Sequence, residues 1–285
     1  MSVNLFKGAL LMSTANVAFC AMACLVKYVS SVNVYTTTLF RFLIGLGVLG
    51  ILAMSGRVKL AFVDKPALFL RGLMGGVAIC IGFFSITRLG IIKASVIVYM
   101  YPVFATLFGC LLLRERVSAR KIAATAGAFA GACVLLFDKK SSAGLFAGFG
   151  LYEIVAITGA VIAGLTVVSV KKLHETDSTV AIFFAQCLVG LWIVLIPASV
   201  DTGTISLPSS IIMVAIGLLA TAGQLLSTDS YRYMSVSNGS LLVMISPILS
   251  CMAGVLFFHE HMTIRTISGA AIVLGSTGFA LLAKE

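Results

Sequence analysis

The sequence predicts an all-α membrane protein with ten transmembrane helices, arranged as two inverted five-helix repeats around a central cavity. The first observation behind this prediction is composition. Of the 285 residues, 60% are hydrophobic and only 11% are charged, and the mean hydropathy is +1.12. A soluble domain needs a more polar surface than this.

The second observation is an internal repeat. The segment SVIVYMYPVFATLFGCLLLRERVSARK returns later as SLLVMISPILSCMAGVLFFHEHMTIRT. Pro102 recurs as Pro247 and Glu115 as Glu260, each 145 residues later and without a gap. A constant spacing indicates duplication, and many secondary transporters are built from such repeats. The predicted repeats are residues 1–140 and 146–285.

A membrane-spanning helix needs about 20 mainly apolar residues. Turn residues and charges divide the chain into ten such spans, 5–29, 34–54, 66–87, 92–113, 118–137, 148–170, 178–197, 208–231, 238–258 and 264–283. The first span has no small-residue cleavage site after it, so we expect a retained helix and not a signal peptide. The third and fourth spans are separated only by RLGIIK.

Five spans in each half place the second copy in the membrane upside down relative to the first. Charge then predicts the orientation. One side carries Lys7, Arg57, Lys59, Lys65, Arg71, Arg114, Arg116, Arg120, Lys121, Lys171, Lys172, Arg232 and Lys284, and the other carries Lys27, Arg88, Lys93, Lys139, Lys140 and Arg265. The richer side should be cytoplasmic, with both termini there, in the inner membrane. These charges lie in short loops, so we expect no nucleic-acid partner.

The sequence contains no motif for an enzyme, a cofactor or a metal. There is no GxGxxG, Walker loop, HExxH or nucleophile elbow. The seven cysteines lie in apolar runs, where they act as small apolar residues. The cluster His259-Glu260-His261 consists of adjacent residues, which diverge on a helix and make a poor metal site. Without an ATP-binding loop, a primary pump is also disfavoured.

The half-repeat carries an arginine early in its second span (TTLFRFLIG), then LGIIKASVIVYMYPVFATLFGCLLLRERVS and a closing GAFAGACVLL. It resembles the EamA module of the drug/metabolite transporter superfamily over nearly the whole chain. The second half departs at one place, where Gln186 stands in the position of Arg41. The resemblance implies a ten-helix exporter or exchanger of small metabolites, with amino acids and their derivatives prominent among the substrates.

Pro102 and Pro247 lie inside the fourth and ninth spans, where a proline removes a backbone hydrogen bond and kinks the helix. We predict that they act as hinges beside the cavity, in preference to static kinks. The residues flanking them are the expected cavity wall in these spans: Tyr99, Tyr101, Met244 and Ser246.

Polar stripes on two other spans should face protein or water and not lipid. In the first span Asn16 belongs to a face with Ser13, Cys20, Cys24 and Lys27. It is a substrate-binding candidate, and a helix–helix hydrogen bond is an equal alternative. The eighth span offers Thr221, Gln224, Ser227, Thr228 and Tyr231 on one face, of which Gln224 and Tyr231 are substrate-binding candidates. Asp229 and Arg232 should form a local ion pair.

Arg41 and Glu153 are charges within the second and sixth spans. Both are candidates for coupling, with Glu153 as the one candidate proton carrier, and each would be less costly to bury if the two were paired. The favoured interpretation is that both side chains reach the membrane interface, with Arg41 fixing the depth of its helix.

These features predict a secondary transporter that moves a small metabolite by alternating access, with walls from spans 1, 3, 4, 6, 8 and 9. The favoured activity is export of amino acids or related metabolites. Two alternatives are an uptake carrier for a nucleotide-like or cofactor-like solute, disfavoured because Arg41 alone is a weak anion site, and a non-transporting sensor or assembly factor. The expected partners are a small-molecule substrate and the lipid bilayer, and small-residue pairs such as Gly127–Gly131 leave a homodimer open.

Overall fold

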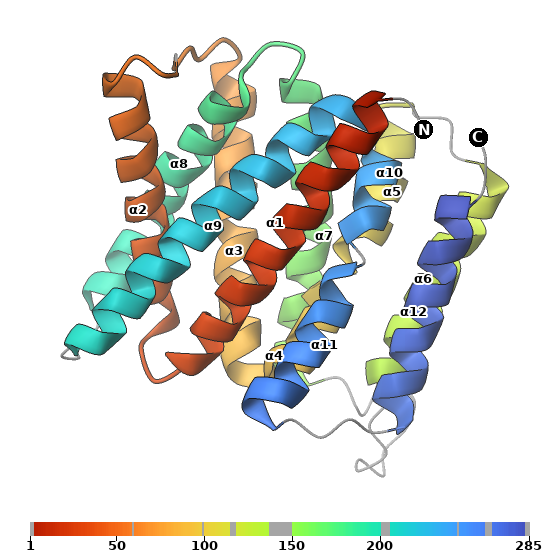
Figure 1. The fold of residues 1–285 in the computed structure, drawn as a ribbon. Coiled ribbons are helices and arrows are strands. Elements are labelled where there is room, and N and C mark those ends of the chain that lie inside the picture. The colour runs from red at the N-terminus through yellow and green to blue at the C-terminus, as the bar shows by residue number, and fades with distance from the viewer. Residues whose placement is uncertain are drawn as a thin grey trace.

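The structure, a computed structural model, describes residues 3–58, 60–98, 100–114, 118–136, 150–200, 206–243, 245–259 and 264–282. In these residues it contains helices and no strands (Figure 1). The helices are α1 (Val3–Tyr28), α2 (Val34–Met54), α3 (Lys65–Leu89), α4 (Ile91–Val98), α5 (Tyr101–Leu112), α6 (Ala119–Leu136), α7 (Leu151–Leu173), α8 (Thr179–Ser199), α9 (Leu207–Tyr233), α10 (Val236–Val243), α11 (Ile245–Phe258) and α12 (Ile264–Leu282).

Six of the described helices are long and apolar enough to cross a membrane by length and composition, namely α1, α2, α3, α7, α8 and α9. The predicted fourth and ninth spans differ from expectation, because each consists of two helices. The fourth divides into α4 and α5 just before Pro102, and the ninth into α10 and α11 just before Pro247. The prolines therefore stand at the start of a new helix, where the missing N–H costs little. The predicted fifth and tenth spans correspond to α6 and α12.

The helix boundaries repeat with the same spacing as the sequence. Moving α2 and α4 forward by 145 residues gives the bounds of α8 and α10. The packing repeats as well, since α1 lies on α9 while its counterpart α7 lies on α3, and α5 lies on α7 while α11 lies on α1. The pairs α2–α8 and α6–α12 each join a helix to its own counterpart. Exchanging the two halves thus leaves the arrangement of contacts unchanged. Both termini lie at the same end of the bundle (Figure 1).

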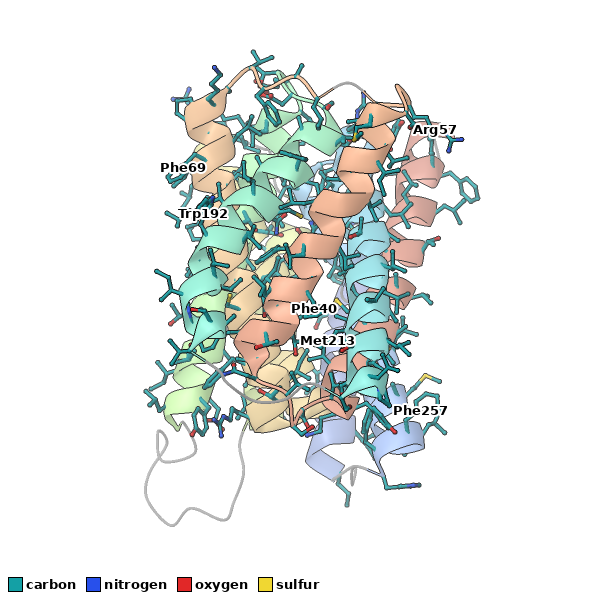
Figure 2. All side chains as sticks on the ribbon, turned by 90° about the vertical axis from the view of Figure 1, so that its left-hand side faces the viewer. Phe40, Arg57, Phe69, Trp192, Met213 and Phe257 are labelled. Carbon is teal, nitrogen blue, oxygen red and sulfur yellow. The ribbon has the colours of Figure 1, made fainter. Side chains whose placement is uncertain are left out.

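Large apolar side chains lie on the outside of the bundle and several polar ones lie inside, the opposite of the distribution in a soluble protein. Large apolar residues project outward, among them Phe69, Trp192 and Phe257, each more than half exposed (Figure 2). Polar and charged residues lie inside, including Arg41, Arg71 and Gln186. An apolar exterior around a polar interior suits a bundle surrounded by lipid tails.

Glycines allow the helices of the two halves to approach closely. At Gly76 of α3, an added Cβ would lie 2.9 Å from the Cα of Gly190 of α8. At Gly164 of α7, it would lie 2.9 Å from the backbone nitrogen of Ala105 in α5. Small residues at helix crossings are typical of membrane bundles, where packing replaces the hydrophobic effect.

Candidate functional site

A cavity of about 190 Å³ lies between the two halves of the bundle. Its described lining residues are Phe19, Met22, Ala23, Arg41, Arg71, Gly75, Ala78, Ile79, Gly82, Phe83, Ile86, Ala94, Val98, Tyr101, Ala163, Thr166, Val167, Val170, Gln186, Gln224, Ser227, Thr228 and Tyr231. They come from α1, α3, α4, α5, α7 and α9, which belong to five of the six spans expected to form the wall. Two further helices, α2 and α8, contribute Arg41 and Gln186. No described residue of α10 or α11, the expected sixth span, lines the cavity.

Arg41 is 4% exposed and reaches the cavity from α2. Its Nη2 donates to the Oε1 of Gln224 at 3.3 Å, and its Nη1 lies 3.3 Å from the sulfur of Met22. The guanidinium also lies over the ring of Phe83, 5.5 Å from the centroid, a geometry that attracts a cation. The charge is therefore held inside the bundle and does not extend to the interface.

Arg71 is the main departure from the sequence expectation. The sequence places it among the cytoplasmic charges that set topology, and this is wrong, because it is buried in α3 with 3% of its surface exposed and lines the cavity. Its Nε and Nη1 have no hydrogen-bond partner in the part of the chain that the structure describes. Removing Arg71 from the count leaves the positive charge bias of the loops in the same direction.

Gln186 stands beside Arg71. An added Cβ at Gly75 of α3 would collide with the Nη1 of Arg71 and would lie 2.9 Å from the Nε2 of Gln186, so both polar groups lie over this glycine. Gln186 is 2% exposed, and its Oε1 has no hydrogen-bond partner among the described residues. The residue at the repeat position of Arg41 thus faces the same cavity without carrying a charge.

The polar face of α9 lies on the cavity. Gln224, Ser227, Thr228 and Tyr231 all line it. Gln224 accepts from Arg41 and its Nε2 donates to the hydroxyl of Thr228 at 3.4 Å, so its amide orients the arginine. Asp229 and Arg232 form the expected i, i+3 ion pair at 3.4 Å, which confirms that prediction.

Two of the other candidates lie away from the cavity. Asn16 is 1% exposed, and its Nδ2 donates to the carbonyl oxygen of Leu242 in α10 at 2.9 Å, which is the helix–helix bond given as its alternative role. Ser246 is fully buried, and its hydroxyl has no partner among the described residues. Tyr99 and Met244 lie outside the described residues.

The helix break in the first half opens directly onto the cavity. Val98 is the last residue of α4 and Tyr101 the first of α5, and both line the cavity. Pro102 is the second residue of α5 and is buried. Pro247 is the third residue of α11, and the helices before the two prolines end 145 residues apart, α4 at Val98 and α10 at Val243. The boundary between α4 and α5 therefore lies on the cavity wall.

Glu153 is the third residue of α7 and is 7% exposed. Its Oε2 lies over Gly150, the residue before the helix begins, 2.8 Å from where a Cβ would stand. A glutamate here is favoured by the partial positive charge of the helix start. Glu153 is not among the lining residues of the cavity.

A set of polar contacts joins α7 to α9 and to the segment before α3. The Nζ of Lys171 donates to the carbonyl oxygens of Tyr231 and Met234, both at 2.9 Å. The carboxylate of Asp177 accepts from the backbone N–H groups of Val63 and Asp64. Burial alone would raise the pKa of Asp177, but these bonds and one from Thr176 outweigh it, so its pKa lies below the usual value.

His174 belongs to the same set. Its Nε2 lies 2.9 Å from the carbonyl oxygen of Thr228. Because a carbonyl only accepts, Nε2 carries the hydrogen, and Nδ1 is buried with no partner in the described chain. Burial therefore lowers the pKa of His174, since a second proton would have no acceptor, and the bond to Thr228 only partly offsets this.

The sequence contained signals for two of the cavity residues that were not predicted as site residues, Gln186 and Arg71. Gln186 could be found from the repeat, because it is the counterpart of Arg41. Arg71 lies within the predicted third span, and a charge within a span is a functional hypothesis by default. No sequence pattern distinguishes the loop contacts of Asp177, which depend on the segment after α7 meeting the segment before α3.

Comparison with known proteins agrees with this architecture. The chain is 26% identical over 280 residues to the pseudopaline exporter CntI of Pseudomonas aeruginosa, with 96% of each chain covered. It is 25% identical over 229 residues to solute carrier family 35 member G1 of Mus musculus, covering 76% of this chain and 62% of that one. A protein of known crystal structure shares the fold with a TM-score of 0.71 at 20% identity, over 99% of this chain and 96% of the other.

The family assignment rests on both halves of the chain. The EamA-like transporter family matches residues 6–137 and, separately, residues 150–282. The relatives with an assigned role are transporters and not enzymes. With two family repeats, apolar helices that can cross a membrane and a cavity that Arg41, Arg71 and Gln186 line, this chain belongs to the EamA-like transporter family.

Proposed function

We propose that this protein is a secondary transporter that exports amino acids or related small metabolites across the cytoplasmic membrane by alternating access. The observation that carries the proposal is the boundary between α4 and α5, which lies on the cavity wall at the place where α10 meets α11 in the second half. Broken helices at a repeat interface are a common way to build a substrate site and to let two halves rock. Similarity to an exporter supports the outward direction.

The proposed topology has ten spans, two inverted halves and both termini in the cytoplasm. The positive charge bias of the loops and the placement of both termini at one end of the bundle support it. Ser30 after α1 and Glu175 after α7 are exposed and stand 145 residues apart, so they are equivalent in the two repeats. In a cysteine-free background, Ser30→Cys and Glu175→Cys should react with an impermeant thiol reagent from opposite sides. Reaction from one side only would contradict inversion.

Transport itself is tested with everted vesicles from cells that lack or overproduce the protein. Radiolabelled amino acids and their N-acetyl derivatives should accumulate in vesicles that contain the protein and not in the others, because everted vesicles turn export into uptake. A lack of difference across a broad panel of solutes would favour a non-transporting role. The cavity already counts against that role, since buried Arg41, Arg71 and Gln186 line it and the α4–α5 boundary lies beside it.

Proton coupling through Glu153 stays a subsidiary proposal, supported by its burial in an apolar helix. Glu153→Gln should abolish transport driven by a pH gradient and leave solute exchange intact, because exchange moves no net proton. A second candidate function is uptake of a nucleotide-like or cofactor-like solute. Arg71 favours it, because the cavity holds two arginines where the sequence offered one. The direction of flux in the vesicle assay separates the two functions.

A further inference from the structure

We infer that Arg71 and Gln186, with Arg41 as a second positive charge, form a subsite for an anionic group of the transported solute. The inference rests on the proposed function and narrows its substrate class. The shared chemistry is that of a carboxylate or a phosphate. Arg71 lies at 3% exposure on the cavity wall, with two of its donor nitrogens unpaired in the described chain.

The first argument is charge balance. Two buried arginines, Arg41 and Arg71, line the same cavity. Among the described lining residues there is no aspartate or glutamate. Positive charges inside a membrane protein are costly unless they are paired. A bound anion would supply a counter-charge for Arg71, whose Nε and Nη1 have no partner in the described chain.

The second argument is the hydrogen-bonding capacity of the subsite. Arg71 offers Nε and Nη1, two charged guanidinium donors without a partner in the described chain, and each can donate to an oxygen of a carboxylate or phosphate. The amide nitrogen of Gln186 lies over the same glycine, Gly75, and adds a third donor. Arg41 is already engaged by Gln224 and Phe83, so it acts as a fixed charge while Arg71 makes the contact.

The third argument concerns the rest of the solute. Away from the arginines the wall is mainly apolar and aromatic, with Phe19, Ile79, Phe83 and Tyr101. A pocket with a few polar groups on an apolar wall orients a ligand by its polar end. The fitting solute is a small molecule with one anionic group and an apolar body, which includes amino acids and their N-acylated derivatives.

The test measures binding to the purified full-length protein, without transport. The probes are N-acetylphenylalanine, which is an anion at pH 7, and its neutral amide, which has nearly the same shape. The acid should raise the thermal unfolding midpoint with a saturable concentration dependence, and the amide should bind about tenfold more weakly or worse. Phenyl phosphate, tested in parallel, reports whether the subsite prefers phosphate to carboxylate.

Two variants and one control complete the test. Arg71→Gln should reduce the affinity for the acid about tenfold or more and remove the preference over the amide. Arg71→Lys keeps the charge but replaces the guanidinium donors Nε and Nη1 with one ammonium, so it should keep the preference for the acid with weaker affinity. Arg57→Gln, an exposed arginine at the end of the bundle, should bind like the wild type (Figure 2).

The inference fails if the wild type binds acid and amide equally, or if Arg71→Gln keeps the preference. The comparison of acid and amide on the wild type does not depend on whether a variant folds. If the protein transports neutral solutes and binds the acid and the amide equally, the anion subsite is refuted and the proposed transport function stands. If the protein binds the acid selectively but moves no solute, the subsite is supported and the proposed transport function is refuted.

Discussion

The side-chain amide of Asn16 in α1 donates a hydrogen bond to the carbonyl oxygen of Leu242 at 2.9 Å, in the last turn of α10. The last carbonyls of a helix have no partner within the helix. In a membrane-buried region no bulk water can replace that partner. Asn16 therefore provides a donor for the carbonyl of Leu242 near the end of α10, and it connects the first half of the chain to the second.

Asn16→Val should destabilise the protein by about 1 kcal/mol, because it leaves the carbonyl of Leu242 without its donor. The measurement is the thermal unfolding midpoint of purified protein without added solute. Thr14→Val serves as the control, since Thr14 is exposed and its hydroxyl bonds only to Leu10 of its own helix. An unchanged midpoint together with weaker solute binding would instead support the substrate-binding role predicted from the sequence.

The pKa of His174 predicts how stability depends on pH. Its pKa is lowered in the folded protein, so the unfolded chain takes up the proton first as the pH falls below about 6.5. Stability should therefore be constant for this group above that pH and should decrease below it. Lys171 and Arg232 nearby add to the effect, and Asp229 opposes it.

His174→Gln should reduce this loss of stability between pH 7.5 and pH 5.5, because glutamine keeps an N–H donor for Thr228 but does not titrate. Unfolding midpoints at both pH values provide the measurement. His259→Gln is the matched control, as His259 is exposed at the end of α11, and it should keep the pH dependence of the wild type. If both variants lose the same stability between pH 7.5 and pH 5.5, protonation of His174 is not the cause of the pH dependence.

Gly164 lies where α7 packs closely against α5, so we expect a larger residue there to destabilise the protein. A Cβ at this position would lie 2.9 Å from the nitrogen of Ala105 and 2.7 Å from the Cβ of Phe104, and backbone cannot move aside as a flexible side chain can. Gly164→Ala should destabilise by about 1–3 kcal/mol. Gly47→Ala in α2 has no neighbour within 4 Å of the added Cβ and should be neutral or slightly stabilising. Equal unfolding midpoints for the two variants would contradict this packing.

The sequence predicted the long helices well where one apolar run stood between clear boundaries. The bounds of α2 match the predicted span, and α8 begins one residue later than expected, after Ser178 caps it by accepting from Ala181. Gly90, with φ of 82°, separates α3 from α4, a turn that an L-residue would strain. The sequence signal there was only the short string RLGIIK.

The helix breaks were harder to predict than the helices. Proline predicts a kink, but whether the helix bends or stops depends on what satisfies the freed backbone groups, and Asn16 comes from a helix more than 200 residues away in sequence. Arg71 was missed for a related reason. Near the end of a span, an arginine can reach out to water or turn inward, and only the packing of α3 against α7 and α8 decides between these orientations.

The hinge prediction follows from the equivalence of the two breaks. Pro102 and Pro247 begin matching helices in two halves that we propose to be inverted, so the α4–α5 break and the α10–α11 break should open the cavity toward opposite sides. Replacing either proline with alanine lets the helix continue through the break. Pro102→Ala and Pro247→Ala should then shift the population of open states in opposite directions.

Labelling of a cavity cysteine measures that shift. Ser227→Cys is suitable, because Ser227 lines the cavity and serine and cysteine are close in size, and Gln224 remains in place to hold Arg41. An impermeant reagent applied from one side should react faster in one proline variant and more slowly in the other. Pro197→Ala is the control, since Pro197 lies inside α8 where the helix continues without a break. Rates that change in the same direction in both folded variants would leave the prolines as packing residues, because a static kink has no side to favour.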